Sequence, residues 1–126
     1  MFSEKEIITK AWLCKEITEL VLLSKNITVD KIFLIGSYAS KKQNEWSDLD
    51  FLIQLRGVKV GKIYPSWDEI LEIHAKLNTK RIHVIFGTEE AAKSLWEKHK
   101  HEEKNYAFRE ITLKEIQYAG TRSPSA

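Results

Sequence analysis

Two aspartates one residue apart, Asp48 and Asp50, are the side chains in this sequence that most clearly suggest chemistry. They open an apolar run over residues 51–55, whose aromatic and branched side chains predict a buried strand. Because side chains alternate across a strand, both carboxylates should point to one face. Neighbouring carboxylates repel each other. A divalent cation such as Mg²⁺ commonly offsets this repulsion and keeps substrate phosphates as further ligands.

A glycine–serine pair, Gly36 and Ser37, precedes Asp48 with the ten residues 38–47 between them. It follows a second apolar run over residues 31–35, which also predicts a buried strand. Glycine permits a sharp turn after a strand, and the backbone amides that follow can then face an anion. A phosphate site beside a metal site is suited to phosphoryl or nucleotidyl transfer.

The spacing of Gly36, Ser37, Asp48 and Asp50 between two apolar strands resembles the nucleotidyltransferase signature of the DNA polymerase β-like superfamily. The short chain is similar to the minimal nucleotidyltransferase branch of that superfamily. Members of this branch often act as antitoxins that pair with a helical HEPN-domain toxin. The resemblance covers roughly residues 31–86.

The resemblance implies an α/β fold, a small mixed sheet of three to four strands with packed helices, and a cleft at the ends of the first two strands. It implies that Asp48 and Asp50 hold Mg²⁺ and that Gly36 and Ser37 seat an NTP, plausibly ATP. The NMP group would then pass to a hydroxyl, plausibly a tyrosine of a partner protein.

The expected third strand, residues 81–86, departs from the family pattern. Family members usually carry a third acidic residue there, whereas this chain has His83 and no Asp or Glu over residues 74–87. Imidazole is a poor ligand for Mg²⁺. His83 could accept the proton of the incoming hydroxyl, or it could join the two aspartates around a transition metal. A third alternative is that the site is degenerate and the protein is a binding module that masks a toxin without turnover.

Composition limits the class of protein. The chain has 126 residues, 43% of them hydrophobic, and a net charge of +2. This length and composition predict one domain over residues 1–119, a frayed tail over 120–126 and a cytoplasmic location. The weak charge does not by itself indicate nucleic acid, so a polyanion groove is the minority interpretation. The single cysteine, Cys14, excludes an intrachain disulfide and is expected to be buried. No apolar run is long enough for a membrane helix. The sequence leaves undecided whether a second copy of the chain or a partner protein completes the cleft.

Helical periodicity and capping residues give the remaining elements. Helices are expected over residues 3–25, 38–42, 67–77 and 89–101. Residues 102–119 fit a helix imperfectly, and residues 111–118 could instead form a short edge strand. In the polar loop 43–47, Trp46 could stack on a base or pack against the first helix. Lys59 and Lys62 are flexible cations that could contact a triphosphate.

Overall fold

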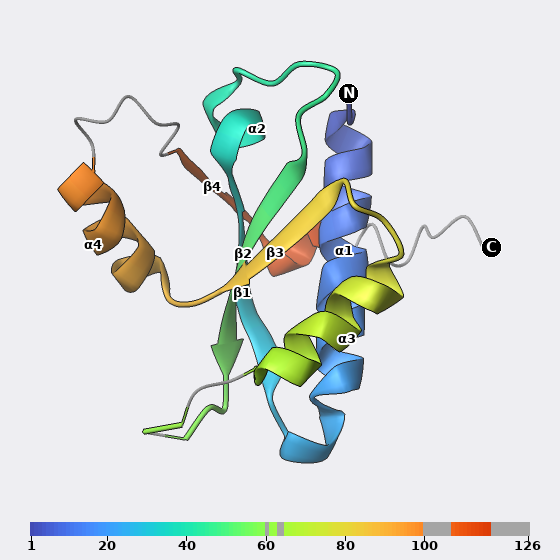
Figure 1. The fold of residues 1–126 in the computed structure, drawn as a ribbon, viewed down its shortest axis with the longest axis vertical. Helices are drawn as coiled ribbons and strands as arrows, with labels where there is room; N and C mark the ends of the chain where they lie inside the picture. Colours follow the sequence, from blue (N-terminus) through green and yellow to red (C-terminus); the bar gives the residue numbers. More distant parts are fainter. Residues whose placement is uncertain (60, 63–64, 100–106, 117–126) are drawn as a thin grey trace.

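The computed structural model describes residues 1–59, 61–62, 65–99 and 107–116 (Figure 1). Its centre is a mixed four-stranded sheet in the order β3-β2-β1-β4. β1 pairs antiparallel with both β2 and β4, whereas β2 and β3 run parallel. This arrangement confirms the predicted α/β fold class. The strands are β1 Thr28–Ile35, β2 Leu49–Arg56, β3 Ile82–Phe86 and β4 Phe108–Ile111.

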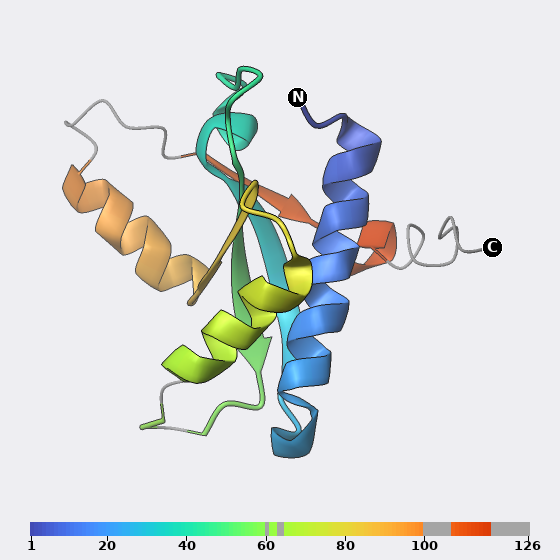
Figure 2. The ribbon, with the colours of Figure 1, turned by 45° about the vertical axis from the view of Figure 1, so that its right-hand side comes forward.

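The helices lie on both faces of this sheet. α1 and α3 cover one face, and α4 lies against the other (Figure 2). Ser3 and Ser66 cap α1 and α3 through reciprocal capping boxes, as the sequence predicts. The helices are α1 Glu4–Val21, a 3₁₀ turn Leu23–Lys25, α2 Gly36–Ser40, α3 Trp67–Leu77 and α4 Glu89–His99.

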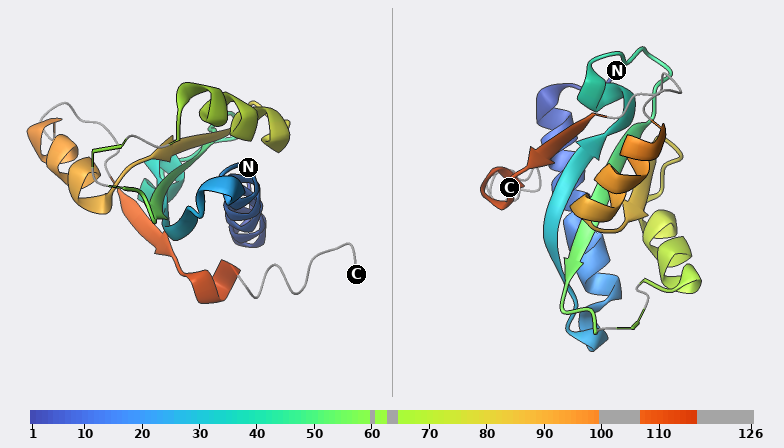
Figure 3. Two further views of the ribbon diagram at one scale, coloured as in Figure 1. Left: turned by 90° about the horizontal axis from the view of Figure 1, so that it is seen from below. Right: turned by 90° about the vertical axis from the view of Figure 1, so that its left-hand side faces the viewer.

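Alternation along the strands divides the apolar side chains between two cores. The larger core packs under α1 and α3 and includes Ile32, Phe51 and Ile82. The smaller core, on the α4 side, consists of Phe33, Ile35 and Leu52, with Ala92 and Phe108 packed against it. Figure 3 shows α4 in front of one part of the sheet. Asp50 alternates with Phe51 and shares the face of Leu52, so the predicted site lies on the less covered side.

Two isoleucines of β3 test this assignment of faces. Ile82 is 1% exposed and Ile85 is 53% exposed. We expect Ile82→Ala to lower the free energy of unfolding by about 2–5 kcal/mol, because it leaves a cavity in the larger core. Ile85→Ala is the matched control and should cost less than about 1 kcal/mol. Urea denaturation of both variants measures the difference, and equal losses would contradict the assignment.

Several predicted boundaries need correction. α1 ends at Val21 rather than near Lys25, because the chain tightens into a 3₁₀ turn that ends at Asn26 in a left-handed conformation. β1 starts at Thr28, three residues before the predicted strand, since Asn26 already completes the reversal. α2 begins directly at Gly36 rather than at Tyr38 and ends at Ser40, with Lys41 in the left-handed region.

The alternative of an edge strand over residues 111–118 is wrong in its bounds over the described part. The edge strand is β4, which pairs with the end of β1 and stops at Ile111. Residues 113–116 form a helical turn, and Thr112 caps it by accepting from the Glu115 amide. The predicted tail, residues 120–126, lies outside the described residues, as do residues 100–101 of the predicted fourth helix.

Two further side chains bear on the sequence predictions. Cys14 is fully buried, as expected, and burial raises the pKa of its thiol to about 12, so the thiolate nucleophile is not formed at neutral pH. Trp67 lies at helical spacing from the apolar residues of α3 but is 71% exposed. Glu69 pairs with Lys25, and α3 buries Ile73 instead, which turns Trp67 outward. None of the helices in the described part is both long and apolar enough to cross a bilayer.

Candidate active site

The glycine–serine turn and the two aspartates meet where β1 ends and β2 begins. Ile35, the last residue of β1, pairs directly with Asp50. Gly36 follows with φ +72°, in the region that favours glycine. A Cβ atom on Gly36 would lie 2.6 Å from Asp50 Oδ2. The structure therefore places the predicted phosphate turn directly against the predicted carboxylate pair.

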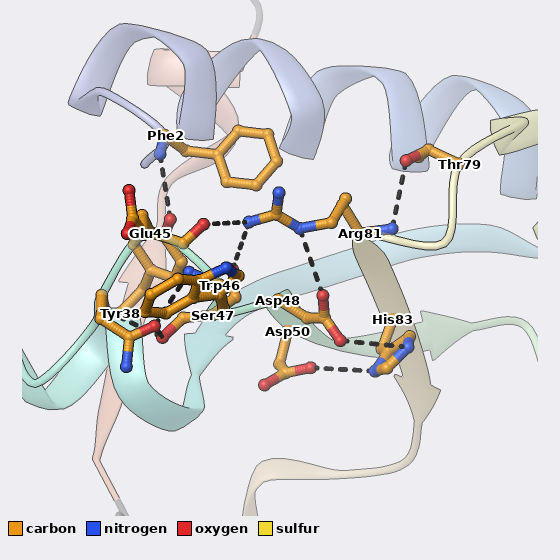
Figure 4. A network of polar contacts seen from close by, with 11 residues as sticks. Phe2, Tyr38, Glu45, Trp46, Ser47, Asp48, Asp50, Thr79, Arg81 and His83 are labelled. Atoms are coloured by element: carbon orange, nitrogen blue, oxygen red, sulfur yellow. Dashed lines mark hydrogen bonds and ion pairs between the residues drawn. The ribbon is translucent and has the colours of Figure 1, made fainter.

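His83 stands opposite Asp50 on the neighbouring strand β3, in the position that the family resemblance gives to a third acid. Both of its ring nitrogens face the carboxylates (Figure 4). Nδ1 lies 3.4 Å from Asp50 Oδ1, and Nε2 lies 3.7 Å from Asp48 Oδ2. Asp48 and Asp50 thus share one face, as the strand alternation predicts, and the imidazole lies beside both.

Arg81 is a site residue that sequence reasoning missed. Its Nε lies 3.3 Å from Asp48 Oδ1, and its Nη2 donates to the backbone oxygens of Ser47, at 2.8 Å, and Glu45, at 3.2 Å. The guanidinium also lies over the ring of Phe2, 5.6 Å from the ring centroid. A signal was available: Arg81 precedes His83 by two residues, so an extended chain places both on the face of the aspartates.

Phe2 links α1 to the glycine–serine turn. Its backbone amide donates to the hydroxyl of Tyr38, at 2.9 Å, and the two rings meet edge to face with centroids 5.9 Å apart. Tyr38 itself is buried and lies one residue after Ser37 in α2. The start of the chain therefore supports the turn from one side, while Asp50 contacts it from the other.

The surroundings of Asp50 shift the pKa of its carboxyl. Burial raises the pKa of the Asp50 carboxyl, and the negative charge of Asp48 acts in the same direction, whereas His83 opposes the shift. The net direction is upward. An ionised Asp50 is therefore held in the folded protein at a cost, which a bound cation would relieve.

The raised pKa gives a stability prediction. The folded protein holds the Asp50 proton more tightly than the unfolded chain, so this carboxyl destabilises the fold at neutral pH and the cost disappears as pH falls through its folded-state pKa. We expect Asp50→Asn to raise Tm at pH 7 by about 2 °C, for a gain of roughly 0.5 kcal/mol. At about pH 3 the two proteins should unfold alike. Thermal unfolding followed by circular dichroism measures this, and a lower Tm for the variant at pH 7 would contradict it.

The loop before Asp48 is ordered by its own hydrogen bonds. The Asn44 side chain accepts from the Trp46 amide at 2.9 Å, and the Ser47 hydroxyl accepts from the Asn44 amide at 2.9 Å. Trp46 is 78% exposed, so the alternative that it packs against the first helix is wrong.

Lys59 and Lys62 are not near the carboxylates. β2 carries the chain away from Asp50 as far as Arg56, a length of about 20 Å, before the loop that contains both lysines. Figure 1 shows that loop at the opposite end of the sheet from the loop before β2. The interpretation of these two lysines as triphosphate contacts is therefore wrong, because an extended strand separates them from the site.

The two carboxylates suit one kind of metal ion better than another. Among the described residues, no three His, Cys, Asp or Glu side chains are grouped so as to hold an ion by themselves. This disfavours a transition metal held by His83 and both aspartates. Mg²⁺ takes one or two carboxylates and completes its shell with water and substrate phosphates. The oxygen donors of Asp48 and Asp50 suit that mode, and the costly ionisation of Asp50 supports it.

Comparison with known protein families agrees with this geometry. Residues 15–108 match the family described as Polymerase beta, Nucleotidyltransferase, and the chain belongs to that family. One solved structure to which the chain is similar is described as a toxin–antitoxin with AMP-PNP. The likeness has 12% sequence identity and a TM-score of 0.41, and covers 88% of this chain and 84% of the other. No curated protein matches the sequence.

Proposed function

We propose that this protein transfers an NMP group, AMP in the leading case, from an NTP to a hydroxyl of a partner protein in a metal-dependent reaction. The observation that supports this most is the contact between Gly36 and Asp50, because it joins an anion-binding turn to a carboxylate pair within one site. The family assignment gives the same reaction class. The proposed partner is a HEPN-domain protein, on the strength of the sequence resemblance.

Each residue has a defined part in this proposal. Asp48 and Asp50 would hold Mg²⁺, which when bound neutralises charge on the α-phosphate and the departing pyrophosphate. The first amides of α2, at Gly36 and Ser37, have no acceptor within their helix and would bind phosphate oxygens. Arg81 fixes the position of Asp48 through the contact at 3.3 Å.

The proposed transfer needs no reactant other than the NTP and the acceptor hydroxyl. The acceptor oxygen forms a bond to the α-phosphorus, and the bond from that phosphorus to the bridging oxygen of pyrophosphate breaks. The hydroxyl proton passes to the His83 imidazole or to water. His83 is suited to this step because an imidazole nitrogen can accept a proton and its ring lies beside Asp50.

A second candidate function is favoured by the groups that lie against the two aspartates. Arg81 and His83 place a guanidinium and an imidazole against Asp48 and Asp50, and no third acid stands at position 83. This arrangement suits a nucleotidyltransferase fold that binds a toxin without turnover. Such a module would form a stoichiometric complex with its partner and release no pyrophosphate.

Two radiolabels separate these candidates. The protein, with a HEPN-domain protein that co-purifies with it, is incubated with Mg²⁺ and ATP labelled on either the α- or the γ-phosphate. Transfer predicts acid-stable label on the partner from α-labelled ATP alone, with matching pyrophosphate release. A stable complex with no label from either ATP supports the binding module. Label from γ-labelled ATP would contradict both, because it indicates a kinase reaction.

A further inference from the structure

We infer that Trp46 is the surface on which the nucleobase of the bound nucleotide stacks. The inference rests on the proposed function, because it requires a nucleotide at the carboxylate pair. It assigns a binding role to a residue for which packing gives no reason: the indole is 78% exposed.

The backbone on both sides of Trp46 is held by a single guanidinium. Arg81 Nη2 binds the carbonyl of Glu45 before it and the carbonyl of Ser47 after it, and Nε of the same group contacts Asp48 (Figure 4). Within the loop, the Asn44 side chain accepts a hydrogen bond from the Trp46 amide. The indole is therefore presented on an ordered support, so little backbone order has to be gained when a ligand binds.

The position of Trp46 matches the distance that a nucleotide spans. Its Cα lies two residues before that of Asp48, hence within about 7 Å of it along the chain. A nucleobase is joined to the α-phosphate through one ribose, so a nucleotide whose phosphates meet Asp48 and Gly36 places its base on the surface around that point. Trp46 offers an aromatic face there.

The other aromatic side chains drawn around the carboxylates are already engaged. Tyr38 is 4% exposed and accepts a hydrogen bond from the Phe2 amide. The ring of Phe2 packs edge to face on Tyr38 and lies under the Arg81 guanidinium. Of these three, Trp46 alone has an open ring face. Stacking on it would tolerate different bases, because every base has a π face.

The test compares two ligands that share phosphates but differ in the base. One is α,β-methylene-ATP with Mg²⁺, which cannot transfer its α-phosphoryl group, and the other is inorganic tripolyphosphate with Mg²⁺. Calorimetry should show that Trp46→Ala weakens binding of the nucleotide about tenfold and leaves tripolyphosphate unchanged. Trp46→Phe should recover most of the affinity.

Trp67 provides the matched control. It is 71% exposed and lies in the first turn of α3, at the end of the sheet away from the carboxylates. Trp67→Ala should bind both ligands like the wild type. The nucleotide should also quench indole fluorescence in the wild type and in Trp67→Phe, but not in Trp46→Phe.

Two outcomes would overturn the inference while the proposed function stands. Unchanged nucleotide affinity in Trp46→Ala would show that the indole serves something else, such as a partner protein. Equal weakening of both ligands would show that Trp46 supports the loop rather than the base. A wild type that binds neither ligand with Mg²⁺ would instead refute the proposed function and the stacking inference with it.

Discussion

Replacing Asp50 with asparagine is expected to lower nucleotidyl transfer by about a thousandfold or more while leaving the protein folded. The amide keeps the shape of the side chain but removes the charge that a divalent ion needs from this position. Asp50 also lies against Gly36, so its carboxylate would hold the ion beside the phosphate turn. Release of pyrophosphate under saturating Mg²⁺ and ATP measures the loss.

Asp30 is the matched control for this substitution. It lies in β1 but pairs with Gln54 and Arg56, toward the end of β2 that is far from the site. Those partners lower the pKa of its carboxyl, and the hydrogen bond from Gln54 makes the largest contribution. Asp30→Asn should therefore keep wild-type transfer and lose a little stability at pH 7, whereas Asp50→Asn should lose transfer and gain stability. An Asp50→Asn protein with wild-type turnover would refute the mechanism.

Replacing Gly36 with alanine is expected to have the second largest effect, on both nucleotide binding and stability. Alanine is strained at φ +72°, and its Cβ would lie 2.6 Å from Asp50 Oδ2. Either the carboxylate or the turn must move, and both belong to the site. We expect the free energy of unfolding to fall by about 2–3 kcal/mol and Mg²⁺–ATP to stop raising Tm.

Gly61 allows the backbone strain to be separated from the collision with Asp50. Its φ is +80°, close to that of Gly36, but a Cβ atom there meets nothing within 4 Å. Gly61→Ala therefore carries the backbone strain without the collision, and should cost about 1 kcal/mol and leave the ligand-induced rise in Tm intact. Thermal unfolding with and without Mg²⁺–ATP compares the two variants. Equal behaviour would mean that the contact with Asp50 has no part in the loss.

The sequence was sufficient where a local rule decides the structure. Serine followed by glutamate three residues later located the starts of α1 and α3. Alternation placed Asp48 and Asp50 on one face, and the family pattern placed His83 opposite them. These features depend on neighbours in the chain or on a fixed motif, so they needed no knowledge of packing.

The features that were missed depend on contacts between distant segments. Alternation from His83 could have placed Arg81 on the face of the aspartates, but its two backbone acceptors, the carbonyls of Glu45 and Ser47, leave no trace in the sequence. Trp67 fits the apolar stripe of α3 by its spacing, but that helix buries Ile73 and Leu77 and leaves Trp67 exposed. The position of β4 is set by its pairing with residues 32–35 of β1, which local periodicity does not reveal.

The central place of β1 determines how the molecule opens. Residues 32–35 have strand partners on both sides, and Gly36 follows immediately. The amides of this segment should exchange with solvent deuterium only through global unfolding, whereas the edge strands and α4 can open in smaller, more frequent fluctuations. The phosphate turn is therefore attached directly to the segment that unfolds last. A partner that displaced α4 or paired with an outer strand could reshape the periphery of this protein without dismantling its phosphate turn.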